Sequence, residues 1–474
     1  MSASTLLHFP AGFQWGAATS AYQIEGAHDE DGRSPSIWDT FARQPGRVLE
    51  GHTGDVACDS YHRIEEDVAL LKQMGAKVYR FSVAWPRVVP SGRGAVNAKG
   101  LDYYSRLVDA LLAADIQPMV TLYHWDLPQC LQDEGGWEVR ETAHAFVAYA
   151  EAVFKALGDR VRQWITLNEP WCSANLSNQI GEHAPGQRNH QATLAVAHHL
   201  LLAHGLTVRR FRELKLPGEI GMAPNVDWRE PYSQSQADID ACRRGLEWFN
   251  NWYLDPIYFG HYPEEMLERY AELGARPPVQ DGDMAIIASP TDFLGINYYT
   301  GSYTLAPDVP PQLKRSGDAK AELAALLGAS TVDVPGFELT DIGWAIYPEG
   351  FYRVLLWLRD RYGNPPVYIT ENGACYNNGP DGDGRVRDNK RIAYCQRHLI
   401  AMHRAIRSGC NVRGYTLWSL LDNFEWAWGY TMRFGLVHVD FATLERRPKD
   451  SFHWFASVIR RNAVEPGEAG RLAF

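Results

Sequence analysis

Cysteine is scarce in this sequence, and its few copies form no recognised pattern. The 474 residues contain seven cysteines, an odd number, and no two of them form a Cys-x-x-Cys pair. Disulfide-stabilised domains and structural zinc sites depend on even or clustered spacings, so the sequence predicts neither. Unpaired cysteines suit a reducing compartment, and we therefore expect a cytoplasmic protein.

Long apolar runs and blocks of basic residues are also missing. No stretch reaches the roughly 18 consecutive apolar residues of a membrane span, and residues 1–10 have no Lys or Arg ahead of an apolar segment. The formal net charge is −11, without a long Lys/Arg block. Neither a membrane nor a nucleic acid is an expected partner; the oligomeric state stays open.

Flat aromatic side chains, in contrast, are abundant. The chain has 16 Trp and 23 Tyr, and 45% of its residues are hydrophobic, which is ample for a large core. Sugar-binding clefts use aromatic faces as readily as cores do, although most of these rings are expected in the core. The length would fit two or three domains, but a single α/β barrel with long loops also reaches this size.

Two stretches share one pattern, an apolar and β-branched run that delivers a glutamate and is then broken. Residues 368–373 read YITENG, in which Gly ends the run just after Glu371. Residues 164–170 read WITLNEP, in which Pro follows Glu169. Each run predicts a buried strand with a carboxylate at its C-terminal end. A parallel barrel brings such strand ends together, and paired carboxylates are what cleavage of a glycosidic bond requires.

The rest of the chain alternates between predicted strands and amphipathic helices. Strands are expected at residues 13–18, 77–82, 117–123, 164–168, 220–223, 293–298, 368–371 and 412–417. Helices are expected at residues 61–74, 101–114, 142–157, 191–214, 237–252, 263–273, 391–408 and 449–460. The count of eight and the absence of a Gly-x-Gly-x-x-Gly motif favour one closed (β/α)8 TIM barrel over residues 1–474, an α/β fold, rather than an open doubly wound sheet. The irregular segments 306–339 and 376–387 follow strands, so we expect long loops at the C-terminal face.

Nearly every predicted strand ends in, or is closely followed by, a polar or aromatic residue. Loop caps would explain one or two such residues, but packing does not explain them at almost all eight strand ends. We therefore expect a functional site at the mouth of the barrel. The residues are Gln23, Arg80, His124, Asn168, Glu169, Asn225, Asn297, Tyr299, Glu371 and Trp418.

Further motifs extend this pattern over nearly the whole chain. They read FQWGAATSAYQIEGA, RFSVAWPR, LYHWDLP, TLNEP, FLGINYYT, ITENG, YTLWSLLDNFEW and RPKDSFHWF. In this order and at this spacing they resemble the family 1 glycoside hydrolases, the β-glucosidase family. The resemblance implies a retaining β-glycosidase that removes terminal, non-reducing β-D-glucosyl residues from β-glucosides and cello-oligosaccharides through a covalent glycosyl-enzyme. It implies no cofactor and no metal.

By this resemblance, Glu371 of the E-N-G motif is the nucleophile and Glu169 of the N-E-P motif is the acid/base. A retaining enzyme holds its two carboxyl groups about 5–5.5 Å apart. At that distance the charge of one carboxylate should raise the pKa of the other by about two units, which puts the pKa of Glu169 at about 6 to 7. Arg80 and Tyr299 match positions that keep the nucleophile ionised; a salt bridge in the core is the alternative for Arg80.

The resemblance also assigns residues to the non-reducing sugar. Trp418 is expected to stack beneath the pyranose ring, because an indole face complements the apolar face of a sugar. Asn297, at the end of its strand, is a further candidate for substrate contact. Hydrogen bonds to the sugar hydroxyls are expected from Gln23, His124, Asn168, Glu425 and Trp426.

The aglycone side is less specific in the sequence. Trp344 matches a position that commonly stacks on the second sugar or the aglycone. Cys172, Leu176 and His183 lie where the family varies its entrance, and ordinary loop packing explains them equally well.

Two positions separate branches of the family. Members that act on 6-phosphorylated sugars carry Ser at the position of Glu425 and a Lys near Met432, which this chain lacks. An acid at this position repels phosphate, so an unphosphorylated substrate is expected. Plant thioglucosidases replace the acid/base by Gln; because this chain keeps Glu169, we expect it to hydrolyse O-glycosides.

Two other classes of protein compete with this interpretation. A metal-dependent barrel hydrolase needs histidines at strand ends, but His198, His199 and His204 lie within the apolar helical run AVAHHLLLAHG. A non-catalytic sugar-binding protein needs no proton donor, which disagrees with the presence of both Glu169 and Glu371. The run NNGPDGDG lacks the ligand pattern of a calcium loop and is interpreted as a turn.

Overall fold

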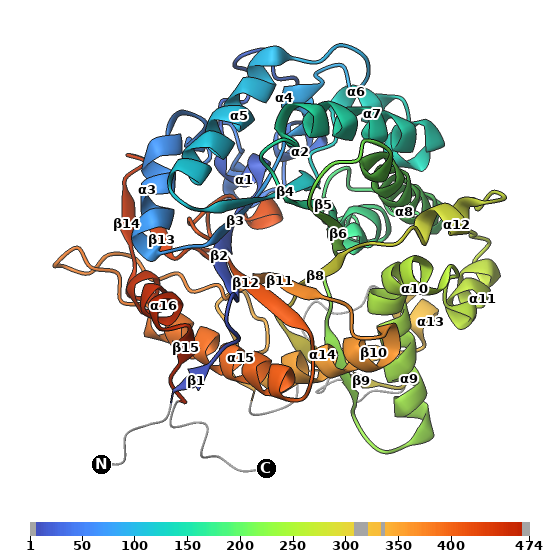
Figure 1. The fold of residues 1–474 in the computed structure, drawn as a ribbon. Helices are drawn as coiled ribbons and strands as arrows, with labels where there is room; N and C mark the ends of the chain where they lie inside the picture. The colour runs from blue at the N-terminus through green and yellow to red at the C-terminus, as the bar shows by residue number, and fades with distance from the viewer. Residues whose placement is uncertain (1–5, 308–320, 333–336, 467–474) are drawn as a thin grey trace.

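The computed structural model describes residues 6–307, 321–332 and 337–466. Within this part of the chain, eight parallel strands close into a barrel at the centre of Figure 1. β12 pairs in parallel with β2, with Gly414 opposite Gln14, and this pairing closes the ring. The predicted (β/α)8 TIM barrel is therefore confirmed. The barrel strands are β2 (Gln14–Ala18), β3 (Val78–Ser82), β4 (Gln117–Tyr123), β5 (Gln163–Asn168), β6 (Glu219–Ala223), β8 (Phe293–Asn297), β11 (Val367–Asn372) and β12 (Val412–Trp418).

Helices surround the barrel as an outer layer (Figure 1). In the first long one, α3, Ile64, Val68 and Leu71 are buried at helical spacing, and the left-handed Gly75 (φ 82°) ends the helix. None of the described helices is both long and apolar enough to cross a membrane. The longer helices are α3 (Ile64–Met74), α5 (Ala98–Ala113), α7 (Arg140–Leu157), α8 (His190–Glu213), α9 (Gln236–Leu246), α10 (Trp252–Phe259), α11 (Glu264–Glu272), α14 (Pro348–Tyr362), α15 (Asn389–Arg407) and α16 (Asp450–Arg461).

Shorter elements occupy the loops of the barrel. A π-helical segment, η4 (Cys172–Ile180), follows β5 directly. β1 (Leu7–His8) pairs with β15 (Ala463–Val464), and β13 (Val437–Val439) pairs with β14 (Arg446–Pro448). The short helices are α1 (Ala21–Ile24), α2 (Ile37–Ala42), α4 (Trp85–Val88), α6 (Gln129–Asp133), α12 (Asp283–Ile287) and α13 (Ala321–Leu327).

The segment 306–339, expected to be an irregular loop, lies partly outside the described residues. Its described part contains α13 and β10 (Ser330–Val332). β10 pairs with β9 (Gly301–Leu305), and β9 pairs with β7 (Trp228–Pro231), which gives a three-stranded sheet separate from the barrel. The expectation was therefore wrong for these residues, because short strands gain their stability from neighbours that lie far away in the sequence.

Helix α14 is an element to which the sequence analysis assigns no structure. Its signals are nevertheless present: Pro348 occupies the first turn, Phe351 and Leu355 are buried on one face, and the left-handed Gly363 (φ 75°) ends the helix. The run NNGPDGDG was correctly interpreted, since Gly384 donates its N–H to the carbonyl of Asp381 (2.8 Å) in a turn.

The barrel interior is packed with apolar side chains that come mostly from the first halves of the strands. This packing leaves the C-terminal ends of the strands to carry polar groups, as in other barrels of this architecture. The cluster consists of Val78, Met119, Ile165, Ala223, Phe293 and Tyr368.

Candidate active site

A cavity of about 510 Å³ opens at the C-terminal end of the barrel. Residues at the ends of β4, β5, β6, β8, β11 and β12 line it, so one end of the barrel forms a single mouth. Asn225 lines it as well. Besides Asn225, nine of the twelve other residues predicted for the site are among the lining residues: His124, Glu169, Asn297, Tyr299, Trp344, Glu371, Trp418, Glu425 and Trp426.

Glu371 lies in the cavity with strong donors on both of its carboxyl oxygens. Arg80 Nη1 donates to Oε1 (2.6 Å), and the Tyr299 hydroxyl donates to Oε2 (2.6 Å). Burial raises the pKa of Glu371, whereas the Arg80 charge and these hydrogen bonds lower it. The Arg80 salt bridge therefore does not belong to an unrelated part of the core, because its carboxylate partner is Glu371 itself.

Glu169 faces the same cavity in a different electrostatic setting. Asn297 Nδ2 donates to Oε1 (2.7 Å), and Cys172 Sγ donates to Oε2 (3.2 Å), so both donors are neutral groups. Burial is the largest cause that raises the pKa of Glu169, and the negative charge of Glu371 adds to it. The sequence analysis attributed the raised pKa to the charge alone; the structure adds burial as the larger cause.

Three buried side chains connect the two glutamates. Asn168 Oδ1 accepts hydrogen bonds from Arg80 Nη2 and from Asn297 Nδ2 (2.9 Å). Asn297 also donates to Glu169, while Arg80 donates to Glu371. The cation thus lies beside Glu371 and a neutral amide lies beside Glu169. This arrangement gives two identical groups different proton affinities, because the Arg80 cation favours the ionised form of Glu371 more strongly than the neutral donors favour that of Glu169.

Another wall of the cavity is formed by Glu425, His124, Trp418 at the end of β12 and Trp426 in the loop that follows. The His124 ring is nearly parallel to Trp418 and to Trp426, with interplanar angles of 16° and 15°. Glu425 Oε2 and His124 Nδ1 are buried and have no hydrogen-bond partner among the described residues. Burial, followed by the charges of Glu371 and Glu169, raises the pKa of Glu425 to about 8. A ligand rich in hydroxyl groups would provide partners for both orphaned atoms.

Gln23 and Asn168 lie behind the cavity wall and not on it. Gln23 Nε2 donates to Asn423 Oδ1 (3.1 Å) and to the carbonyl of Phe424 (2.8 Å), which fixes the backbone just before Glu425. Asn168 Nδ2 contacts His124 Nε2 (3.1 Å). In this structure the two amides therefore orient other site residues.

Aromatic and aliphatic side chains surround the outer part of the cavity. Trp344 lies here, in contact with the ring of Tyr299 at 5.4 Å between centroids. The sequence analysis missed Trp125, which directly follows His124, and Trp428, which extends the motif ending at Trp426. A place within or beside a motif was the available signal for these two and for Trp171, which directly follows TLNEP; no motif pointed to other lining residues such as Phe249 and Ile342.

The backbone is strained at three lining residues. Trp125 (φ 77°), Glu169 (φ 45°) and Trp426 (φ 49°) adopt left-handed conformations that bulky side chains rarely take. Such strain costs on the order of 1–3 kcal/mol per residue and persists where surrounding structure demands it, commonly at functional sites.

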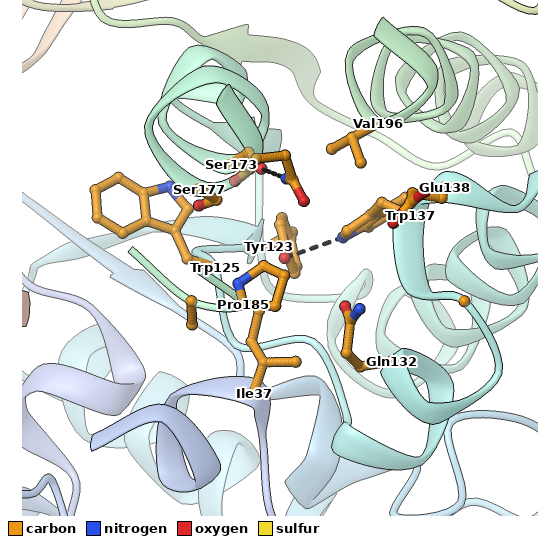
Figure 2. Close-up of a pocket in the computed structure, with 13 residues that line it drawn as sticks. Ile37, Tyr123, Trp125, Gln132, Trp137, Glu138, Ser173, Ser177, Pro185 and Val196 are labelled. Atoms are coloured by element: carbon orange, nitrogen blue, oxygen red, sulfur yellow. Dashed lines mark hydrogen bonds between the residues drawn. The ribbon is translucent and has the colours of Figure 1, made fainter. Parts of the chain in front are cut away.

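A second, much smaller cavity adjoins the first one at Trp125. Figure 2 shows Trp125 at its edge, together with Tyr123, whose hydroxyl accepts a hydrogen bond from Trp137 Nε1 (3.0 Å). Its volume of about 10 Å³ is close to the space that one water molecule needs, so it is too small for a substrate. Among the residues that line the two cavities, Trp125 is shared.

The three histidines of the AVAHHLLLAHG run in α8 have hydrogen-bond partners inside the fold. His198 contacts Asp283 and Tyr262 (both 2.9 Å), and burial lowers its pKa. His199 contacts the carbonyl of Trp137, and His204 contacts the hydroxyl of Thr166. Within the described ranges, no group of three His, Cys, Asp or Glu residues is arranged to hold a metal ion.

Gly373 is expected to be essential to the geometry of the site. A Cβ atom at this position would lie 1.8 Å from the carbonyl oxygen of Trp418. The substitution Gly373→Ala should therefore displace β11 from Trp418 and lower kcat/KM by at least about 10-fold, since a misplacement of 1 Å can cost about 100-fold. Gly379→Ala is the matched control, because a Cβ there meets nothing within 4 Å. Equal activities and melting temperatures for the two variants would contradict the expectation.

Known proteins of similar sequence and fold match nearly the whole chain. The model of glycosyl hydrolase family 1 matches residues 6–464. The chain is 46% identical over 454 residues to beta-glucosidase A of Acetivibrio thermocellus, covering 96% of this chain and 98% of that protein. It is 47% identical over 461 residues to a bifunctional beta-D-glucosidase/beta-D-fucosidase of Bifidobacterium breve, covering 95% and 98%. The solved structure of a family 1 β-glucosidase from Thermotoga maritima in complex with isofagomine lactam is similar, with a TM-score of 0.91, 44% identity, and coverage of 97% of this chain and 100% of that one.

Proposed function

Because this chain belongs to glycosyl hydrolase family 1, we propose that it is a retaining β-glucosidase in which Glu371 is the nucleophile and Glu169 the acid/base. Its substrates are terminal, non-reducing β-D-glucosyl residues of β-glucosides and cello-oligosaccharides. One observation carries the proposal: two buried carboxyl groups face one cavity, one beside a cation and the other beside neutral donors.

In the first step, the ionised Glu371 attacks the anomeric carbon of the sugar. Arg80 and Tyr299 hold its two oxygens, so the carboxylate is both charged and aimed. Glu169 gives its proton to the leaving glycosidic oxygen as that bond breaks. The products are a glucosyl ester of Glu371, the free aglycone and an ionised Glu169.

In the second step, Glu169 acts as a base. Formation of the ester removes the negative charge of Glu371. The pKa of Glu169 then falls, so Glu169 stays ionised more readily. Glu169 then takes a proton from a water molecule, which attacks the anomeric carbon and releases Glu371. Two displacements at one carbon return the sugar with its original β configuration.

The wall of Trp418, Trp426, His124 and Glu425 supports recognition of the non-reducing sugar. The unpartnered Glu425 Oε2 and His124 Nδ1 are suited to sugar hydroxyls, and Trp418 provides the flat face beneath the ring. Three carboxyl groups in one cavity disfavour a phosphate, so the sugar is unphosphorylated. Asn297, Asn168 and Gln23 act chiefly by orienting these groups, and Trp344 contacts the aglycone or second sugar.

We also propose a cytoplasmic location and a single catalytic domain. All seven cysteines are free thiols, and six of them are buried, which suits a reducing compartment. The barrel draws its strands from residue 14 to residue 418, so nearly the whole chain is needed to build one site.

A panel of substrates tests the proposed function. Purified protein should hydrolyse 4-nitrophenyl β-D-glucoside and cellobiose, and the 6-phosphoglucoside should react at least about 100-fold more slowly because a buried acid opposes the phosphate. Proton NMR of the reaction should show β-glucose appearing before the α anomer. First appearance of α-glucose, or preference for the phosphorylated substrate, would overturn the proposal. The 4-nitrophenyl β-D-galactoside and β-D-fucoside belong to the same panel. Their rates show how strictly the site recognises the groups at positions 4 and 6 of the sugar.

A further inference from the structure

Cys172 is placed on Glu169 by the first turn of the helical segment that follows β5. The carbonyl of Glu169 accepts the N–H of Cys172 (2.9 Å), which brings the side chains of these residues to the same face. Cys172 Sγ lies 3.2 Å from Glu169 Oε2, and Asn225 Nδ2 donates to the same sulfur (3.7 Å). The thiol is 6% exposed and lines the cavity.

The thiol is a neutral group in this position. Burial raises the pKa of Cys172, and the negative charge of Glu169 raises it further, so the S–H form is retained. A thiol is a weak donor and also a weak acceptor. It can donate to the ionised carboxylate and accept from the protonated carboxyl group. The amide of Asn297 differs, because its nitrogen only donates to Oε1.

We propose that Cys172 is a positioning residue that holds Oε2 of Glu169 in both protonation states of the carboxyl group and adjusts how readily Glu169 gives up its proton. The inference rests on the acid/base role proposed above for Glu169. Since the side chain of Glu169 must serve as an acid and then as a base without turning away, a partner that changes from donor to acceptor suits both steps.

Other charged and titratable groups around Glu169 stay in place when Cys172 is replaced. Each belongs to a different strand or loop of the barrel mouth, so a change in the pH profile of a Cys172 variant reports the lost or altered contact to Oε2. These groups are Arg80 on β3, His124 after β4, Tyr299 after β8, Glu371 on β11 and Glu425 after β12, and Glu182, His183 and Asp227 also line the cavity.

The test compares Cys172→Val with Cys172→Ser in the pH dependence of kcat/KM for cellobiose, whose leaving group needs a proton. Valine removes the donor that favours the carboxylate, so Glu169 keeps its proton to higher pH and the alkaline limb should move up by about half a pH unit. Serine supplies a stronger O–H donor, so the limb should move down by a similar amount. Opposite shifts support the proposal. If the alkaline limb moves in neither variant, or moves in the same direction in both, the proposal is overturned.

Two controls separate this result from other causes. Cys395→Val replaces a buried thiol on α15 outside the cavity lining, and it should leave the profile unchanged; an equal shift there overturns the proposal. Glu169→Ala should still be reactivated by azide. If it is reactivated while the Cys172 variants show no shift, only the role of Cys172 fails. If it is not, the acid/base role itself fails.

Discussion

Replacing Glu371 by alanine is expected to lower the turnover of every β-glucoside by a factor on the order of 10⁴ or more. The variant lacks the atom that forms the glycosyl-enzyme, and the neighbouring Glu169, whose oxygens accept from the neutral groups Asn297 and Cys172, has no cation to keep it ionised as a substitute nucleophile. Initial rates with 2,4-dinitrophenyl β-D-glucoside are the measurement. This substrate has a leaving group that departs without a proton, so the remaining loss reports the nucleophile alone.

The alanine variant needs a partner variant that keeps the site packed. Without Glu371, Arg80 is a buried cation that has lost its carboxylate, and breaking such a pair costs about 3–5 kcal/mol of stability. Glu371→Gln keeps an oxygen for Arg80 or Tyr299 and nearly the same volume, so it should fold and still be inactive. Thermal unfolding distinguishes the two effects. A well-folded Gln variant with more than about a tenth of the wild-type rate would refute the role of nucleophile.

Replacing Glu169 by alanine should produce a different pattern of loss. With the dinitrophenyl substrate the first step needs no acid, so the glycosyl-enzyme accumulates and turnover falls by about 10²–10⁴-fold through the second step. With cellobiose both steps suffer, and the loss should be larger. The alanine also removes a negative charge and leaves space beside the anomeric carbon. Azide can therefore attack the glycosyl-enzyme without a base, which should restore the rate and give β-glucosyl azide.

The pH dependence provides a second measurement of the same role. The raised pKa of Glu169 means that the wild-type rate falls as pH rises through that value, because the proton donor is lost. In Glu169→Ala the residual hydrolysis of cellobiose, whose leaving group needs a proton, should no longer show this alkaline limb, while the acidic limb, set by protonation of Glu371, should remain. Glu371→Gln is the control for azide, which should not reactivate it. An α-azide product from Glu169→Ala, or the same response to azide in both variants, would contradict the roles assigned to Glu169 and Glu371.

The barrel and the identity of its two glutamates were readable in the sequence. Strands that are buried on both faces appear as continuous apolar runs, which is why β4 was predicted with its observed bounds, Gln117–Tyr123. Because the side-chain chemistry changes abruptly at a strand end, Glu169 and Glu371 could be placed at the mouth as soon as the strands were counted. The small sheet of β7, β9 and β10 has no such signal, since its short strands depend on partners far along the chain.

The sequence by itself determined the strand order, the closed barrel and which polar residues its mouth would carry, because local periodicity and residue type encode these features. Only the tertiary structure decided which of those residues contact one another. Arg80 and Glu371 are 291 positions apart, and Asn297 and Glu169 are 128 positions apart. Their pairing follows from closure and register of the barrel, and so do the burial that raises the pKa of Glu169 and the inward turn of Gln23 toward the loop of Glu425. Such contacts depend on distances in space, which spacing along the chain does not record.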